Sequence, residues 1–300
     1  MLNQNNKKVS VIMPAYNSSS FIEESISSIL DQTFENLELI IIDDGSTDET
    51  LSIAKKWAET DNRIVVLSQK NKGVSAARNT AISKATGEIL AFCDSDDVWY
   101  PNKLEKQLIS LGEADWSHCD SRYVGIGFDD KTVYRSTYSR LFSGLIFKQL
   151  AIENFLTTSS LVIRKSVYEK YNGFDESLQA LEDWKLWLQI AKEHPIVLCD
   201  EVLLDYRVQP QSTSRNARSL LPIHLEILDE TFNDEELRNS TLKKEAKCRA
   251  YLIFSYIAEE KNDHLFSLQC SLNLFLCKGN AMSVKRILRT FVNLITQKKR

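Results

Sequence analysis

Short apolar runs alternate with amphipathic segments along the first hundred residues, and this alternation restricts the fold more than any other feature of the sequence. The runs have the length of buried strands, and the segments between them carry apolar residues at helical spacing. Strands that alternate with helices are joined by right-handed crossovers. The sequence therefore predicts an α/β fold of Rossmann type, with a mostly parallel sheet and helices on both faces. The predicted strands are Val9–Met13, Leu37–Ile42, Ile64–Leu67 and Ile89–Cys93.

Two of the helices between these strands are expected to begin with a capping box. Ser20 is followed three residues later by Glu23, and Ser46 is followed by Glu49. In this pattern the hydroxyl of the first residue accepts a hydrogen bond from the backbone of the third helical residue.

Beyond Asp115 the pattern changes to shorter elements. A hairpin is predicted around Gly125–Lys131, and after Ser214 the chain has helical patterns without a strong strand signal. We therefore expect an α/β domain over residues 1–215 and a helical region over residues 216–300. Between the hairpin and the helical region, the sequence predicts helices near Gly144–Asn154, Lys165–Tyr171 and Leu181–Lys192. It also predicts extended segments at Val197–Cys199 and Val202–Val208.

Charge and cysteine usage exclude several classes of protein. A net charge of −4 argues against a nucleic-acid-binding protein, so a bound nucleotide is expected to be a small ligand. The six cysteines form no CxxC pair and no cluster with histidine, which argues against zinc and a disulfide framework and suits a reducing compartment. No apolar run reaches the ~18 residues of a membrane span, and the N-terminal residues lack the apolar core of a signal peptide. These features predict a cytoplasmic protein.

Polar residues follow the first, second and fourth predicted strands. Because ligands bind at the carboxyl ends of strands in such sheets, these residues are expected to meet at one rim. The strongest signal is Asp94–Asp97, which holds three carboxylates in four residues directly after a buried strand. Carboxylates this close repel one another unless a cation neutralises them, and oxygen ligands suit Mg²⁺ or Mn²⁺. A solvated acidic turn is the alternative reading of this motif.

Three further motifs are candidates for the same rim. Asp43 and Asp44 end the second strand, where a carboxylate can accept hydrogen bonds from a ribose or a base, although a turn and helix cap also explains them. Gly73 opens a helix that carries Arg78 one turn in, where a guanidinium can reach a diphosphate, although an ordinary surface arginine is the alternative. Glu182-Asp183-Trp184 opens a later helix, where the acids complement the helix dipole or supply a general base.

Other enzyme classes lack their signatures. The chain has no P-loop and no Gly-x-Gly-x-x-Gly, which argues against ATP hydrolysis and NAD binding. Asp43-Asp44-Gly45-Ser46 is distantly similar to the nucleophile motif of haloacid-dehalogenase-like phosphatases, but its two aspartates are adjacent and not separated by one residue.

The order and spacing of these motifs resemble those of the family 2 glycosyltransferases, which have the GT-A fold. The resemblance covers about residues 8–208 and includes the following segments: Val9–Asn17, Ile42–Asp48, Gly73–Asn79, Asp94–Asp97, Gly173–Glu176 and Glu182–Trp184. It implies a metal-dependent enzyme that transfers a sugar from a nucleoside-diphosphate sugar, with a UDP-sugar favoured, to a glycan or lipid-linked acceptor hydroxyl. It also implies inversion at the anomeric carbon and a role in cell-surface polysaccharide or glycoconjugate synthesis.

The resemblance also implies roles for individual residues. Asp44 would contact the base, and uracil, thymine and guanine all remain open. Asp94 would contact the ribose or the metal-bound diphosphate, Asp96 would hold Mn²⁺ or Mg²⁺, and Asp183 would deprotonate the acceptor. The other residues assigned to the nucleotide-sugar site are Pro14, Tyr16, Asn17, Arg78 and Ser95, with Asp43, Asp97, Glu182 and Trp184 in support.

One position departs from the family pattern. Many relatives carry a histidine in a Tyr-Arg-x-His segment, whereas Tyr206-Arg207-Val208 is followed here by Gln209. An amide is a poor replacement for imidazole at a metal, so the resemblance implies an ion held by aspartates, diphosphate and water.

Two rival functions stay open beside transfer. The first is a catalytically silent protein on the same fold that binds a nucleotide sugar or glycan. The second is a nucleotidyltransferase, which would carry a Gly-rich loop with Arg and Lys where this chain has Pro14–Ser18.

The last segment is amphipathic and basic. Ala281–Arg300 contains six basic residues and no acid, and its apolar residues fall at helical spacing: Val284, Ile287, Leu288, Phe291, Val292 and Ile295. Such a helix can lie on an anionic membrane, which would place the protein peripherally on the inner face, or it can pack its apolar stripe on the core.

Overall fold

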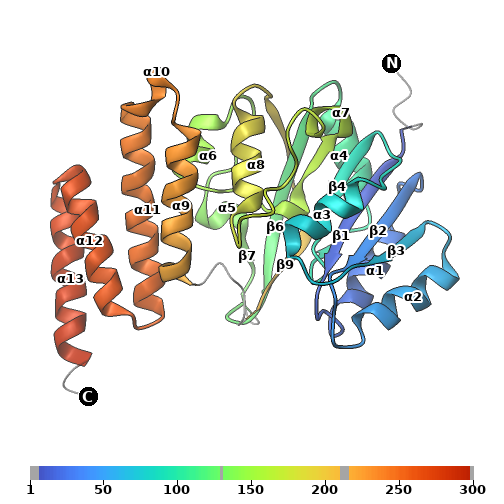
Figure 1. Ribbon diagram of the computed structural model, residues 1–300, viewed down its shortest axis with the longest axis horizontal. Coiled ribbons are helices and arrows are strands. Elements are labelled where there is room, and N and C mark those ends of the chain that lie inside the picture. The colour runs from blue at the N-terminus through green and yellow to red at the C-terminus, as the bar shows by residue number, and fades with distance from the viewer. Residues whose placement is uncertain (1–6, 129–130, 210–215, 298–300) are drawn as a thin grey trace. The chain divides into compact units, whose positions relative to one another are not determined.

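The computed structural model describes residues 7–128, 131–209 and 216–297 of the chain (Figure 1). The chain divides into two compact units. The first contains Met1–Ile146 and Phe155–Pro210, and the second contains Phe147–Asn154 and Gln211–Arg300. The boundary predicted near residue 215 lies outside the described residues.

The first unit is built on one sheet, which has nine strands within the described residues. Its order is β3-β2-β1-β4-β8-β6-β9-β5, with β7 paired to β6. The strands are β1 (Val9–Ala15), β2 (Leu37–Asp43), β3 (Ile64–Ser68), β4 (Ile89–Phe92), β5 (Val98–Trp99), β6 (Trp116–Gly125), β7 (Val133–Tyr134), β8 (Val162–Arg164) and β9 (Ile196–Val208).

The four strands predicted from the first hundred residues are parallel, as expected. β1 pairs with β2 and β4, and β2 pairs with β3. The rest of the sheet is mixed, because β8 runs antiparallel to both β4 and β6 while β6 and β9 are parallel. β6 and β7 form the predicted hairpin, whose residues 129 and 130 lie outside the described part of the chain.

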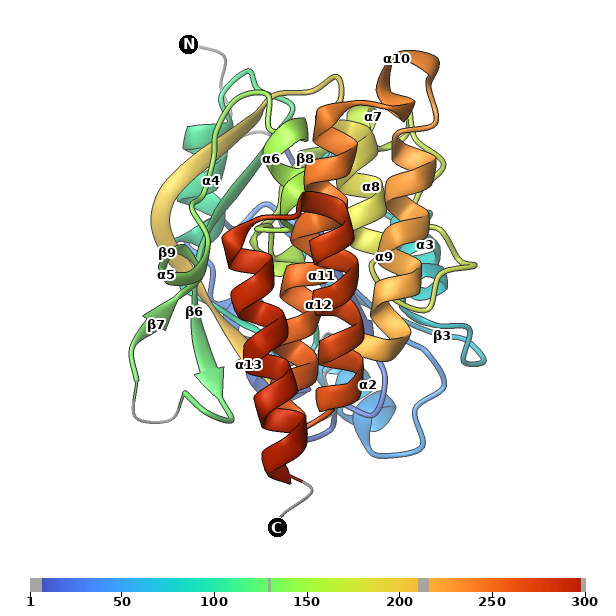
Figure 2. The ribbon, with the colours of Figure 1, turned by 90° about the vertical axis from the view of Figure 1, so that its left-hand side faces the viewer.

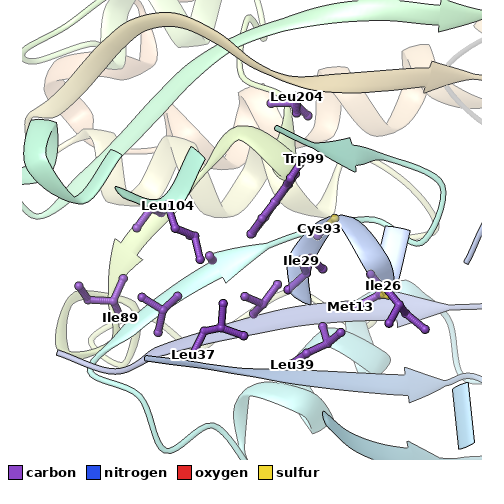
Figure 3. Close-up of a cluster of buried hydrophobic side chains, with 14 of the residues drawn as sticks. Met13, Ile26, Ile29, Leu37, Leu39, Ile89, Cys93, Trp99, Leu104 and Leu204 are labelled. Atoms are coloured by element: carbon purple, nitrogen blue, oxygen red, sulfur yellow. The ribbon is translucent and has the colours of Figure 1, made fainter. Parts of the chain in front are cut away.

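Helices cover both faces of the parallel strands. Side chains from Met13 and Leu39 pack with Ile26 and Ile29 of α1 on one face, where Trp99 and Leu104 also lie (Figure 3). On the other face Phe92 packs edge-on against Trp187. The helices of this unit are α1 (Ile22–Leu30), α2 (Thr50–Thr60), α3 (Val74–Ile82), α4 (Lys103–Leu111), α5 (Arg135–Tyr138), α7 (Lys165–Tyr168) and α8 (Glu182–Ala191), with a 3₁₀ turn at Thr158–Ser160.

Neither predicted capping box forms. α1 begins at Ile22 after Phe21, and α2 begins at Thr50 after Glu49, both without a side-chain cap. The hydroxyl of Ser46 instead accepts a hydrogen bond from the backbone of Asn17 at 3.0 Å. Ser46 therefore joins the loops after β1 and β2 instead of capping α2.

The second unit is helical. Its helices are α6 (Phe147–Ile152), α9 (Ala217–Thr231), α10 (Glu235–Arg238), α11 (Thr241–Glu260), α12 (His264–Lys278) and α13 (Ala281–Gln297). The three long C-terminal helices lie side by side (Figure 2), and a small core forms around Cys248, Leu252 and Leu274. Within the described residues, no helix combines the length and apolar character that a membrane crossing needs.

Candidate active site

Loops after β1 and β2 are joined at the carboxyl end of the sheet. Asn17 adopts a left-handed conformation, with φ of 49°, which is uncommon for a residue other than glycine. Its side-chain oxygen accepts a hydrogen bond from the backbone of Thr47 at 2.8 Å, and its own N–H donates to Ser46. Pro14 lies opposite Ile42 within the sheet, and Tyr16 is half exposed beside this junction.

The two aspartates after β2 have different partners. Asp43 is buried and accepts hydrogen bonds from Ser46 N–H at 3.3 Å and the Ser68 hydroxyl at 3.2 Å. Asp44, also buried, accepts from Lys72 N–H at 2.9 Å and Gly73 N–H at 2.8 Å. Asp44 therefore fixes the loop from which α3 begins.

Gly45 is required between these aspartates and the loop before α3. Its φ is 74°, and an added Cβ would lie 2.8 Å from the backbone nitrogen of Asn71. Both features exclude a side chain, so this glycine lets the loops after β2 and β3 approach each other closely.

Arg78 is buried and links two loops. Its Nη2 lies 2.8 Å from Asp94, after β4, and its Nη1 lies 2.7 Å from Glu182, at the start of α8. The guanidinium also lies over the ring of Phe174, 5.2 Å from its centroid. Burial alone would lower the pKa of Arg78, but the charges of Asp94 and Glu182 outweigh it and raise the pKa. The alternative of an ordinary surface arginine is wrong.

The Asp94–Asp97 segment forms the turn between β4 and β5. Burial and the charge of Asp94 raise the pKa of Asp96 to about 6, against the lowering effect of a hydrogen bond that Gln209 donates to Asp96 Oδ2. Burial and the charges of Asp96 and Asp94 raise the pKa of Asp97 well above its usual range. Ser95 lies 2.7 Å from the hydroxyl of Ser18, which ties this turn to the loop after β1.

A strained residue precedes the third acidic motif. Leu181 has φ of 62°, and α8 begins directly after it. Asp183 accepts hydrogen bonds from the Thr158 hydroxyl at 2.7 Å and from Trp184 N–H at 2.6 Å, while Trp184 itself is fully buried. A left-handed leucine costs conformational energy, and such costs are commonly found at functional sites. The Asp183 carboxylate is thus held in one orientation near the start of α8.

The acidic turn after β4 offers few protein ligands for a divalent cation. Among the described residues, no group of three or more His, Cys, Asp or Glu side chains is placed to hold a metal ion. Mg²⁺ is commonly bound through one or two carboxylates, with water and substrate phosphates completing its shell. Asp94 and Asp96 offer that donor set, so the residues fit an ion held jointly with a diphosphate. Gln209 is placed as a hydrogen-bond donor to Asp96, which is not the role of a metal ligand.

The raised pKa of Asp96 predicts a pH-dependent contribution to stability. The folded pKa is about 6 against an ordinary value of 3.8, so this carboxyl binds its proton more tightly after folding. The stabilisation is present below about pH 4 and is lost as the pH rises through 6. In EDTA, the wild type should lose up to about 3 kcal/mol of unfolding free energy relative to Asp96→Asn between about pH 4 and pH 7. Urea denaturation at each pH measures this difference.

Asp48→Asn is the control for this titration. Hydrogen bonds from Thr50 and Ser19 outweigh partial burial and lower the pKa of Asp48 to about 2. Its contribution is present above its ordinary value of 3.8 and is lost as the pH falls through about 2, so it stays constant over the same window. A constant difference for Asp96→Asn as well would contradict the prediction.

Sequence reasoning missed three residues that position the acids. Thr158 orients Asp183, the hydroxyl of Ser159 accepts from Asp94 N–H at 3.0 Å, and Arg207 N–H donates to Asp97 at 2.9 Å. The run Thr157–Ser160 before an apolar strand was a usable signal, because four successive hydroxyl side chains supply hydrogen-bond donors and acceptors close to the end of the sheet.

The sequence model of the family described as glycosyl transferase family 2 matches residues 10–171, more than half of the chain. The chain belongs to glycosyltransferase family 2. The matched range includes the loops after β1, β2 and β4 and the whole of α3.

Curated relatives agree with this assignment. A putative teichuronic acid biosynthesis glycosyltransferase, TuaG of Bacillus subtilis, is 48% identical over 69% of this chain and 82% of its own. WfgD of Escherichia coli, named a UDP-Glc:α-D-GlcNAc-diphosphoundecaprenol β-1,3-glucosyltransferase, is 32% identical over 86% of this chain and 95% of its own. The chain spans about a third of the length of other relatives it matches, uncharacterized glycosyltransferases of Rickettsia conorii and Rickettsia felis.

Solved structures confirm the fold. TarS of S. aureus, residues 1–349 in complex with UDP-GlcNAc, superposes with a TM-score of 0.64 at 23% identity, covering 94% of this chain and 79% of that one. The mannosyltransferase PcManGT from Pyrobaculum calidifontis, in complex with GDP-Man and Mn²⁺, gives 0.65 at 20% identity, covering 96% and 80%. The predicted GT-A-like α/β fold with a C-terminal helical region is therefore confirmed.

Proposed function

We propose that this chain is an inverting glycosyltransferase that moves a sugar from a nucleoside-diphosphate sugar, with UDP as the favoured nucleotide, to an acceptor hydroxyl. The observation that carries the proposal is the bridge made by Arg78. Its ion pairs to Asp94 and Glu182 join the acidic turn after β4 to the start of α8, where Asp183 lies. Groups suited to a diphosphate and a general base are thereby connected within one site.

The nucleoside would bind at the rim formed by β1 and β2. Pro14, Tyr16 and Asn17 lie at the end of β1, next to the Asp44 loop. Asp44 accepts three hydrogen bonds, from Gln69, Lys72 and Gly73. A carboxylate has about four acceptor positions, which leaves one for an N–H of the base.

The diphosphate would bind at the turn after β4 together with Mn²⁺ or Mg²⁺. Asp96 would hold the ion, with Asp94 beside it and Asp97 in support. The ion would supply positive charge against the charge that develops on the leaving diphosphate. The complex of PcManGT with Mn²⁺ supports divalent-ion use in proteins of this fold.

Asp183 is the proposed general base. The hydrogen bonds from Thr158 and from the backbone of Trp184 orient its carboxylate. It would accept the proton of the acceptor hydroxyl as that oxygen attacks the anomeric carbon on the face opposite the departing diphosphate. One base without an enzymic nucleophile implies inversion, by analogy with the far-side base of an inverting glycosidase.

The biological setting we propose is synthesis of a cell-surface polysaccharide or glycoconjugate, with a glycan or lipid-linked acceptor. The names of TuaG and WfgD support it, since one refers to teichuronic acid and the other to a diphosphoundecaprenol-linked sugar. All six cysteines are free thiols, and five are buried, which suits a reducing, cytoplasmic compartment.

A thermal-shift titration tests the donor site. The protein is heated with UDP, GDP, dTDP or CMP, each with Mn²⁺ or with EDTA. Ligand at about 100 times its dissociation constant adds roughly 2.7 kcal/mol to the unfolding free energy, a shift of several degrees. We expect the shift with UDP, and we expect EDTA or the substitution Asp96→Ala to abolish most of it.

The matched control is Asp200→Asn, which changes an exposed aspartate on β9 and should leave the UDP shift unchanged. A shift with GDP alone would correct the nucleotide but keep the enzyme class. No shift with any nucleotide would contradict the proposed donor site. A UDP shift without transfer to any acceptor would favour the silent nucleotide-sugar or glycan-binding protein.

A further inference from the structure

Helix α13 of the second unit has the reverse of the usual arrangement of side chains. The face packed inside the unit is polar: Ser283 and Thr290 have no exposed surface, and Arg286 is 4% exposed. The face turned to solvent is apolar, and its members are 42–59% exposed: Val284, Leu288, Phe291, Val292 and Ile295. A helix that only completes a water-soluble bundle places its apolar stripe inward.

A buried polar network fixes this orientation. Arg286 Nη1 lies 2.5 Å from Glu259 Oε2, and Arg286 also donates to the hydroxyl and carbonyl oxygens of Ser255. The same guanidinium lies over the ring of Tyr256 at 3.8 Å. Turning α13 to bury its apolar stripe would separate Arg286 from Glu259, and a buried charge without its partner is costly. The stripe therefore remains exposed on the surface of the unit.

The exposed stripe forms one continuous surface with a cationic edge. Val284, Leu288, Phe291 and Ile295 follow one another at spacings of three or four residues, which places them on one side of a helix. Lys285 directly follows Val284, and Arg289 directly follows Leu288, and both basic side chains are exposed. Successive residues lie about 100° apart around a helix, so these two form an edge beside the stripe. Of the two alternatives for this stripe, packing on the core is wrong, because every predicted member except Ile287 is exposed.

We propose that this stripe, defined by Val284, Leu288, Phe291 and Ile295, binds the surface of an anionic lipid membrane. Apolar side chains would enter the boundary between headgroups and acyl chains, with the helix lying in the plane of the surface. The ammonium group of Lys285 would reach lipid phosphates from the edge of the stripe. Arg289 donates through Nε to Glu259 at 3.1 Å, and it would reach them through its Nη groups.

The charge of the segment favours an anionic membrane over a second copy of the chain as the partner of the stripe. The segment Ala281–Arg300 carries six basic residues and no acid, whereas the whole chain has a net charge of −4. A two-fold contact between identical α13 helices would place this cationic edge close to its own copy, which is unfavourable. An anionic surface instead attracts the positive charge that Lys285 and Arg289 present at the exposed edge of the stripe, whereas Arg286 is buried against Glu259. The proposal is independent of the donor site, so a failure of either leaves the other intact.

Vesicle co-sedimentation of the full chain tests the proposal. We expect binding to vesicles of phosphatidylglycerol and phosphatidylcholine, weaker binding to phosphatidylcholine alone, and a decrease as salt rises. Leu288→Ser combined with Phe291→Ser should weaken binding at least about tenfold, because two large apolar side chains no longer enter the lipid. The matched control is Ile109→Ser, which removes an apolar side chain that is 71% exposed on α4 and should leave binding unchanged.

A second variant gives a readout that does not depend on loss of binding. Phe291→Trp keeps an aromatic side chain in the stripe, and its fluorescence should shift to shorter wavelength when anionic vesicles are added. The charge is tested by Lys285→Glu, with Lys55→Glu on the exposed side of α2 as its control. Absence of vesicle binding by the wild type, or a dimer that the double serine variant dissociates, would overturn the proposal and assign the stripe to another contact.

Discussion

Replacing Asp183 with Asn is expected to reduce sugar transfer by about 10²- to 10⁴-fold while leaving nucleotide binding unchanged. The amide oxygen can still accept the hydrogen bond from Trp184 N–H, and the Thr158 hydroxyl can turn to accept from the amide nitrogen. The substitution therefore preserves the local geometry and removes only the capacity to take a proton. The measurement is the initial rate at saturating donor and acceptor, beside the thermal shift with UDP and Mn²⁺.

Asp200→Asn on β9 serves as the control for rate as well, since it makes the same chemical change at an exposed position. Full transfer by Asp183→Asn would show that another group accepts the proton. Loss of both transfer and the nucleotide shift would show that Asp183 contributes to donor binding, and its assignment as the base would then be wrong.

The parallel half of the sheet was predictable because each of its strands is marked by its own short apolar run in the sequence. Strands β1, β2 and β4 are buried on both faces and read as continuous apolar runs, separated by helices of ordinary length. The mixed half was not, because β8 enters the sheet between β4 and β6, which precede it by more than 35 residues. Strand β9 was predicted as two segments because the exposed residues Asp200 and Glu201 interrupt its apolar pattern. In the structure one long strand includes both residues, and its pairing with β6 is irregular nearby.

The failed capping boxes have a related cause. A capping pattern considers only residues three apart, but the hydroxyl of Ser46 lies close to a loop 29 residues earlier and accepts from Asn17. The turn before α2 is instead organised by Asp48, which accepts from the backbone and hydroxyl of Thr50. Polar residues at the ends of strands were correctly placed on one rim, but their individual partners depended on tertiary contacts.

Arg78 is the clearest case of a site residue whose partners could not be predicted from the local sequence. Its position one turn into α3 indicated a ligand-binding group, and nothing in its local sequence distinguished it from a surface arginine. Its partners are 16 and 104 residues away, and they become neighbours only once the β4 turn and α8 are in place. The motif order suggested a common site, and the ion pairs supply the physical connection.

Replacing Arg78 with Met is expected to lower the free energy of unfolding by about 3–5 kcal/mol near neutral pH. Methionine has a similar length and keeps apolar contact with Phe174, so the loss is mainly electrostatic. The variant leaves the carboxylates of Asp94 and Glu182 without the cation that lies 2.8 and 2.7 Å from them. Urea denaturation monitored by tryptophan fluorescence measures the difference.

The pH dependence of this deficit has a definite sign. Burial and the adjacent Asp183 already raise the pKa of Glu182, and Arg78 opposes them. Without Arg78 that pKa rises further, so the folded variant binds a proton more tightly than the unfolded chain. The resulting stabilisation is present below the ordinary value of 4.5 and is lost as the pH rises through the folded pKa. We therefore expect a smaller deficit near about pH 5 than near about pH 8.

Two controls separate the buried bridge from an ordinary ion pair. Arg63→Met breaks a more exposed pair with Asp61 and should cost about 1 kcal/mol or less. Adding Glu182→Gln to Arg78→Met removes one stranded charge and should restore part of the stability. A deficit for Arg78→Met as small as that for Arg63→Met would show that water reaches the bridge. The link between the β4 turn and α8, on which the proposed active site depends, would then be too weak to hold Asp183 near the diphosphate site.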